Sequence, residues 1–237
     1  MTSQITVSDQ YTGNVSPGSD HQKNKAQKNK AQRRDLDNAT IVKISVGPMD
    51  NNAYVITDKA TGEALLIDAA NDAGVLLSLA EQIPGTIRQI VTTHGHPDHW
   101  QALDEVRTGL SVPHAVGTDD AEALPVPADR LLADGDTVVV GDLTLDVIGI
   151  VGHTRGSVTL ALTEHSGRVH LFTGDSLFPG GVGKTWEPGD FEILLNNVDT
   201  KLFERYGDDT AVYPGHGIDT SIAAERPNLP EWRARGW

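Results

Sequence analysis

Residues 93–99 restrict the possible folds of this chain more than any other feature. Their sequence is Thr-His-Gly-His-Pro-Asp-His, which brings three histidines and one aspartate close together along the chain. The apolar run 90–92 comes directly before them and predicts a strand that ends where this loop begins. Neutral imidazoles and carboxylates are ligands of zinc, iron and manganese. The fold must therefore bring a strand end and the following loop to a metal ion.

The composition limits which other groups can take part in such a site. The chain has 237 residues and no cysteine, so any metal ligands must be histidine, aspartate or glutamate. Its net charge of −14 argues against a duplex nucleic-acid partner, which requires a basic surface. No apolar run approaches the roughly 18 residues of a membrane span, and the N-terminus lacks the apolar core of a secretory signal. We expect a cytoplasmic protein that has no membrane partner.

Residues 1–38 differ in composition from the rest of the chain. They are polar and net basic, and they repeat the sequence Gln-Lys-Asn-Lys-Ala at 22–26 and 27–31. Such a composition buries too little apolar surface to offset the entropy of ordering. We therefore predict a disordered tail over 1–38 and one globular domain over 39–237. A basic arm that binds RNA or a membrane is the less favoured interpretation of the tail.

Short apolar runs bounded by turn residues predict that strands dominate the domain, with helices between them. Strands are expected at 41–46, 53–57, 64–67, 87–92, 137–140, 143–150, 158–162, 169–173 and 212–213. Helices are expected at 73–82, capped by Asp72, then after His99 through Val106, at 191–203, and at 222–224, where Pro227 ends the helix. This pattern favours two packed sheets covered by helices.

Further ligand-type residues follow other predicted strands. His153, Asp175, His216 and Asp68 each come directly or shortly after an apolar run, and glycines lie beside the first three. Taken singly, each could be an ordinary surface or turn residue. Because several strand ends can meet at one edge of a sheet, we expect them to join the loop 93–99. Asp68 either accepts a hydrogen bond from the metal-binding loop or is a plain turn residue.

These residues, in this order, resemble the ligand set of the metallo-β-lactamase fold superfamily. The resemblance covers residues 41–220 and implies an α+β fold, a four-layer αββα sandwich of two mixed β-sheets flanked by helices. It implies that one metal ion is bound by His94, His96 and His153 and a second by Asp98, His99 and His216, and that Asp175 bridges them. Two divalent cations are the expected cofactors, with zinc first and iron or manganese as alternatives.

Two cations about 3.5–4 Å apart can share a water molecule and lower its pKa. The expected nucleophile is the resulting bridging hydroxide, which Asp98 would orient as a metal ligand. The sequence contains no Gly-x-Ser-x-Gly motif, so a serine nucleophile is not expected. Asp175 stands where true β-lactamases carry Cys or Ser, and His96 stands where flavodiiron proteins usually carry Glu.

The loop 175–184 resembles that of glyoxalase II-like thioester hydrolases. By that resemblance Lys184 binds a carboxylate of the substrate thiol, and Trp186 either forms a wall of the pocket or packs internally. Two departures weaken glutathione specificity. Val182 replaces the usual cysteine, and residues 217–237 leave no room for the C-terminal helical domain of glyoxalase II.

We therefore expect a binuclear metal-dependent hydrolase that acts on a thioester or related acyl ester of a small thiol. One alternative is a persulfide dioxygenase with a single iron bound by His94, His153 and Asp175. Another is a lactonase that uses the same two metals, and a non-catalytic metal-binding protein is the least favoured. The sequence gives no oligomeric state.

Overall fold

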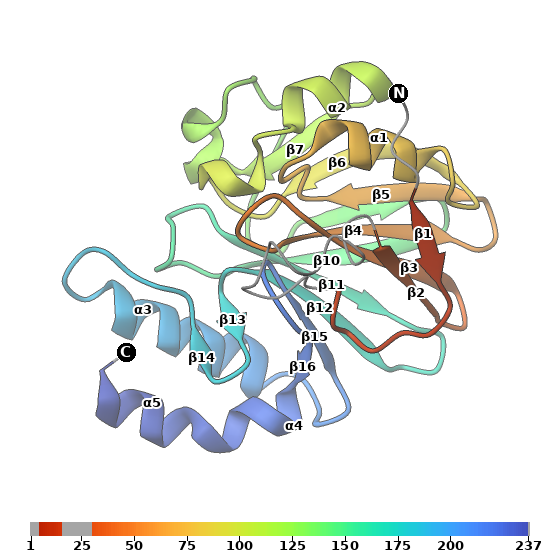
Figure 1. The fold of residues 1–237 in the computed structure, drawn as a ribbon. Coiled ribbons are helices and arrows are strands. Elements are labelled where there is room, and N and C mark those ends of the chain that lie inside the picture. Colours follow the sequence, from red (N-terminus) through yellow and green to blue (C-terminus); the bar gives the residue numbers. More distant parts are fainter. Residues whose placement is uncertain (1–4, 16–29, 237) are drawn as a thin grey trace.

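The computed structural model describes residues 5–15 and 30–236. Two sheets pack face to face, and helices cover both outer faces (Figure 1). Helices α1 and α2 lie on the outer side of one sheet, and α3, α4 and α5 lie on the outer side of the other (Figure 1). The expected αββα sandwich of two mixed sheets is confirmed.

The first sheet has eight strands that follow one another in chain order. These are β1 Thr6–Ser8, β2 Lys30–Asp35, β3 Ala39–Val46, β4 Asn51–Asp58, β5 Glu63–Ile67, β6 Thr86–Thr92, β7 His114–Gly117 and β8 Arg130–Leu132. Strands β2 to β5 are antiparallel, whereas β5 to β8 are parallel. Helices α1 (Ala73–Ala80) and α2 (Leu103–Leu110) are the crossover connections that parallel neighbours require.

The second sheet has six strands in the order β16-β15-β12-β11-β10-β9. These are β9 Thr137–Val140, β10 Leu143–Gly149, β11 Val158–Thr163, β12 Val169–Gly174, β15 Ala211–Pro214 and β16 Thr220–Ser221. A separate hairpin consists of β13 Leu177–Phe178 and β14 Gly181–Val182. The covering helices are α3 Asp190–Asn197, α4 Ile222–Glu225 and α5 Leu229–Arg235. Two short helical segments that are not α-helical adjoin these helices. They are a π-helix over Val198–Phe203 and a 3-10 helix over Arg226–Asn228.

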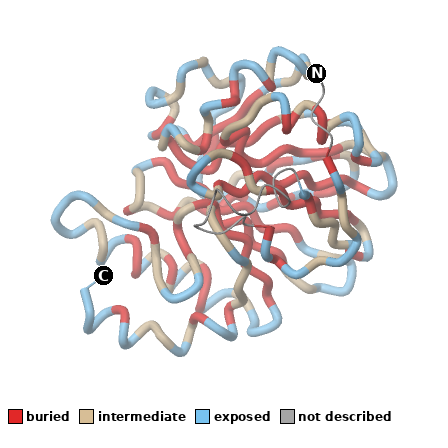
Figure 2. The backbone as a smooth tube through the Cα atoms, viewed as in Figure 1, coloured by how far each residue is buried: buried red, intermediate tan, exposed pale blue. Residues whose placement is uncertain are grey.

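The sheets are buried along their central strands (Figure 2). Inward-facing Ile56, Leu65, Leu160 and Phe172 belong to one cluster between the sheets. Outward-facing residues of the same strands pack under the helices in two further clusters. Burial on both faces explains why these strands have nearly continuous apolar sequences.

The structure differs from the expectation of a disordered tail over 1–38 in the two described parts of that range, residues 5–15 and 30–38. Strand β2 pairs with β3 from Ala31 opposite Ile44 to Asp35 opposite Thr40, and β1 pairs with β2. Ile5, Ala31 and Leu36 are buried. These two strands bury so few side chains that they lack an apolar period, so the sequence pattern did not reveal them. Most of the repeat lies in 16–29, outside the described residues.

Three helix predictions also differ from the structure. Asp72 does not cap α1 with its side chain, because its carboxylate instead accepts a hydrogen bond from Gly47 N at 3.0 Å. The helix expected over 191–203 changes pitch after Asn197. Pro227 does not end the last helix, because it lies in the 3-10 turn that leads directly into α5.

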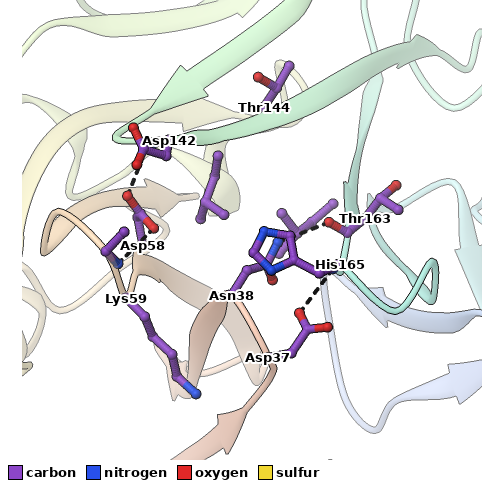
Figure 3. A pocket seen from close by; sticks show the side chains of 11 residues that line it. Asp37, Asn38, Asp58, Lys59, Asp142, Thr144, Thr163 and His165 are labelled. Carbon is purple, nitrogen blue, oxygen red and sulfur yellow. Dashed lines mark hydrogen bonds between the residues drawn. The ribbon is translucent and has the colours of Figure 1, made fainter.

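At the edge where β4 ends and β10 begins, a cavity of about 500 Å³ lies between the sheets (Figure 3). Its polar groups pair across the sheets. Asp58 Oδ2 accepts a hydrogen bond from Asp142 N at 2.9 Å, and Asn38 Nδ2 donates one to Thr163 O at 3.2 Å (Figure 3). Asp37 Oδ1 accepts a third from His165 N at 3.0 Å (Figure 3). These bonds join the sheets at this edge.

Of the helices formed by residues 5–15 and 30–236, none is both long and apolar enough to cross a lipid bilayer.

Candidate metal centre

The ligand-type residues gather at the opposite edge of the sandwich, each just beyond a strand end. Strand β6 ends at Thr92 and leads into the loop with His94, His96, Asp98 and His99. In the second sheet, three strand ends deliver one residue each. His153 follows β10, Asp175 follows β12, and His216 follows β15. The fold thus brings together all seven residues, from four separate segments.

One group consists of His94, His96 and His153, whose nearest ring nitrogens all lie within 4.8 Å of one another. His96 Nδ1 is 2.9 Å from His153 Nε2. Ligand atoms that bind one tetrahedral zinc at about 2.0–2.1 Å are separated by roughly 3.3 Å. The spacing of these nitrogens is therefore that of ligands around a common ion.

A second group consists of Asp98, His99 and His216. His216 Nε2 lies 3.2 Å from both His99 Nε2 and Asp98 Oδ2. Asp175 lies between the two groups. Its Oδ1 is 3.4 Å from His99 Nε2, and its Oδ2 is 3.4 Å from His216 Nε2 and 3.6 Å from His153 Nε2. A carboxylate in contact with both groups can bridge two cations.

Hydrogen bonds orient three of the rings. The Nδ1 atoms of His99, His153 and His216 lie 2.9, 2.6 and 2.9 Å from Asp68 Oδ2, Lys184 O and Met49 O. Because these oxygens accept, each Nδ1 donates and each Nε2 faces the centre, where the neutral ring can offer its lone pair to a metal ion.

Among the seven ligand-type residues, two buried polar atoms lack a hydrogen-bond partner in the described part of the chain, His94 Nε2 and Asp175 Oδ1. An unsatisfied buried polar atom is costly and rare, so each one requires an explanation. A histidine nitrogen and a carboxylate oxygen are both metal-ligand atoms, and both lie close to ligand atoms of other candidate residues. The donor set therefore fits two divalent cations.

The electrostatics of the two histidine groups differ. Burial lowers the pKa values of His94 and His153, and neighbouring histidines add to this effect. For His99 and His216 burial acts in the same direction, but the Asp175 carboxylate outweighs it, with Asp68 contributing at His99 and Asp98 at His216. The pKa of His99 is raised well above its usual range, and that of His216 is raised to about 10. His216 is therefore protonated at neutral pH unless a metal ion displaces its proton.

The two carboxylates of the centre are stabilised in their charged forms. Burial opposes ionisation of Asp98, but a hydrogen bond from His216 and the charge of His99 lower its pKa. Burial likewise opposes ionisation of Asp175, and the charge of His99 together with a hydrogen bond from His216 keeps its pKa far below the usual range. Both side chains are thus available as anionic ligands.

Asp68 is buried beneath the loop 93–99. Its Oδ1 accepts a hydrogen bond from Thr93 N at 2.7 Å, and its Oδ2 accepts one from Thr93 Oγ1 at 2.8 Å. The same Oδ2 accepts the proton of His99 Nδ1. This geometry suits a residue that orients the metal-binding loop, which was the functional alternative for Asp68.

Two residues of the centre were not recognised in the sequence. Asn51, at the start of β4, donates from Nδ2 to Asp98 Oδ2 at 2.9 Å. Asp120 is buried and accepts hydrogen bonds from Gly95 N, Thr154 Oγ1 and Gly156 N at 2.7, 2.6 and 2.8 Å. Neither lies in a ligand-like motif, because their partners are distant in the chain.

Gly215 is required by close packing. A Cβ atom there would lie 2.2 Å from Asp175 Oδ1 and 2.7 Å from His99 Cε1. Any side chain at this position would therefore displace a ligand-type residue.

Lys184 and Trp186 lie together beside the first histidine group. Lys184 Nζ lies 4.4 Å from the centroid of the Trp186 ring. That ring is 6.0 Å from His96 and 6.3 Å from His153, centroid to centroid. Trp186 is 58% exposed, so it does not pack internally. An exposed aromatic ring and a cation therefore border the candidate centre.

A sequence comparison identifies the class of protein that has this two-sheet sandwich and this set of residues at one edge. The sequence profile described as Metallo-beta-lactamase superfamily matches residues 46–216. The chain belongs to this superfamily.

Curated relatives include hydroxyacylglutathione hydrolases. The chain is 40% identical over 140 residues to that of Fuscovulum blasticum, an alignment that covers 58% of this chain and 52% of the relative. It is 30% identical over 207 residues to hydroxyacylglutathione hydrolase GloC of Haemophilus influenzae, covering 79% of this chain and 95% of the relative. The chain thus spans about half the length of the first relative and nearly all of the second.

Two solved structures have a closely similar fold. The structure of BLEG-1 B3 metallo-beta-lactamase has a TM-score of 0.72 at 29% identity and covers 81% of this chain and 98% of its own. That of ETHE1 from Myxococcus xanthus has a TM-score of 0.70 at 30% identity and covers 79% of this chain and 82% of its own. Membership of the superfamily thus supports a metal-dependent hydrolase. Because the relatives carry different names, membership alone does not specify the substrate.

Proposed function

We propose that the chain is a binuclear metal-dependent hydrolase that cleaves a thioester, or a related acyl ester, of a small thiol. The observation that carries the proposal is the pair of ligand groups that share Asp175. Zinc is the expected metal, and iron or manganese would suit the same ligands. The cytoplasmic location expected from the sequence remains a prediction.

Two divalent cations bound there would supply an activated water and polarise the acyl carbonyl of the substrate. The protein contributes orientation. Asp98 is fixed by Asn51 and directs a carboxylate oxygen toward His216, where it can orient the attacking water. His99 and His216 keep their Nε2 atoms toward the centre because Asp68 Oδ2 and Met49 O accept the Nδ1 protons.

Substrate binding is assigned to Lys184 and Trp186. The ammonium group of Lys184 suits a carboxylate on the thiol part of the substrate, and the exposed Trp186 ring suits its apolar portion. The hydroxyacylglutathione hydrolases among the relatives support a thioester of this kind.

The proposal is tested with purified full-length protein loaded with zinc, iron or manganese. Thioesters of glutathione and of a small uncharged thiol, a lactone and glutathione persulfide are offered as substrates. Thioester cleavage with the highest kcat/KM supports the proposal, whereas preferential lactone opening or oxygen uptake would refute it. Asp119→Ala, at an exposed position, is a suitable reference variant.

The similarity to the ETHE1 structure favours one second candidate, an iron-dependent persulfide dioxygenase. It would use His94, His153 and Asp175 for a single iron and leave the second group without metal. Oxygen consumption with glutathione persulfide at one iron per chain would establish this alternative.

A further inference from the structure

The segment that carries His216 connects β15 and β16 of the second sheet, yet several of its hydrogen bonds are made with the first sheet. We define the His216 loop as residues 214–219. Tyr54 Oη and Asn52 Nδ2 both donate to Pro214 O, at 2.7 and 2.8 Å. Asn52 N donates to Gly215 O at 2.7 Å. Strand β4 thus holds the beginning of the loop.

The end of the loop is held by a buried lysine on the neighbouring strand β3. Lys43 is 0% exposed. Its Nζ donates to Gly217 O at 2.8 Å, to Asp219 Oδ1 at 2.6 Å and to Gly13 O at 2.7 Å. An ammonium group has three protons to donate, and here each has an acceptor.

The third acceptor belongs to the N-terminal segment. Gly13 O accepts from Lys43 Nζ and from Asp219 N, the latter at 3.3 Å. Tyr11 Oη donates to Asp219 Oδ2 at 2.6 Å. Residues 11–13 therefore join strand β3 and the His216 loop in one connected polar cluster.

Stability alone does not account for a lysine at this position. Burying an ion pair costs desolvation that the Coulomb attraction roughly offsets, and an apolar pair of similar volume is often as stable. What the ammonium group provides is a defined position for three chain segments. His216 lies inside the segment that it fixes, whereas Asp98 and His99 come from the first sheet.

We propose that Lys43, together with Asp219 and residues 11–13, positions His216 against Asp98 and His99 and so forms the second metal subsite. The inference rests on the two-metal site of the proposed function. The N-terminal segment is then part of the functional centre, although it lies far from the ligands in sequence. Lys43 is a positioning residue, since it contacts no ligand side chain.

The test compares zinc binding by the full-length wild-type chain and by Lys43→Met, measured in competition with a chromophoric chelator. Asp98→Ala, which removes a ligand of the second group, identifies the affinity that belongs to that group. We expect Lys43→Met to weaken this affinity at least tenfold and to change that of the first group by less than about threefold. Equal affinities in wild type and variant would overturn the proposal.

Loss of folding is separated from loss of positioning by Lys43→Met/Asp219→Leu. This double variant removes the unpaired carboxylate, so we expect it to fold, while its second zinc affinity remains reduced. Wild-type affinity in the folded double variant would contradict the proposal. Lys201→Met is the matched control, because Lys201 Nζ likewise donates to a carbonyl and a carboxylate, those of Gly149 and Asp134, but does not contact the His216 loop.

Hydrogen exchange of the metal-free proteins gives a readout that does not depend on metal stoichiometry. The amides of 215–219 should exchange at least tenfold faster in the folded double variant than in wild type, and the loop 93–99 should not change. Unchanged exchange at 215–219 would refute the positioning role. A wild-type chain that binds only one zinc would instead refute the two-metal proposal, and the exchange data would still test the positioning of the loop.

Discussion

Replacing Asp120 should separate the two segments that form the first histidine group. Its carboxylate joins the loop with His94 and His96, through Gly95 N, to the loop with His153, through Thr154 Oγ1 and Gly156 N. Asp120 is only 6% exposed, so water cannot readily replace it. Asp120→Ala removes the acceptor of all three bonds without changing a ligand-type residue.

The expected cost follows from the partners left behind. The Thr154 hydroxyl retains Ser157 Oγ at 2.6 Å as an alternative partner. The buried N–H groups of Gly95 and Gly156 would each lose a charged acceptor, at about 1.5–3 kcal/mol apiece. The free energy of unfolding should therefore fall by about 3–6 kcal/mol. Asp120→Asn keeps one acceptor oxygen and should lose about half of this.

Urea unfolding of the metal-free chain, followed by circular dichroism, measures this loss. Zinc titration should show weaker binding at the first group in the same variant. The exposed neighbour Asp119 provides the control, since Asp119→Ala should change stability by less than about 0.5 kcal/mol. A loss below about 1 kcal/mol for Asp120→Ala, or equal losses for both variants, would refute the reasoning.

Four further predictions concern the centre itself. Asp175→Ala should abolish tight binding of both metal ions in elemental analysis, because its carboxylate lies 3.4–3.6 Å from histidines of both groups. Gly215→Ala should weaken metal binding, because the added Cβ would displace Asp175. Lys184→Ala should raise KM several-fold for a thioester of a carboxylate-bearing thiol and leave KM for a neutral one unchanged in steady-state assays. Because carboxylates outweigh burial and raise the pKa of His216 to about 10 in the metal-free chain, metal must displace its proton. Lowering the pH by one unit should therefore weaken metal binding at the second group about tenfold for each proton that binding releases. Calorimetry in buffers of different ionisation enthalpy should detect that proton release.

Nine strands (β3 to β6, β9 to β12 and β15) and the ligand-type residues beside them could be predicted because their signals are local. The strand β6 and the histidines after it are adjacent in sequence, and glycines mark the turns at His153, Asp175 and His216. Each such signal depends on a few neighbouring residues, so it can be recognised without the fold.

The supporting residues were not predictable for the opposite reason. Asp120 and Lys43 act on partners more than 20 residues away, and in sequence they are indistinguishable from ordinary surface charges. Strands β1 and β2 were missed because they bury single side chains, such as Ala31, rather than an alternating apolar face. They form because β2 pairs with β3 and β1 pairs with β2, and only the fold reveals this pairing.

The proposed hydrolase requires metal at both ligand groups for its activity. Its most direct test is to titrate zinc into the metal-free full-length chain while thioester hydrolysis is measured at each addition. We expect activity to reach its maximum at two equivalents and Asp98→Ala to bind one. Maximal activity at one equivalent, with no change on adding the second, would contradict it.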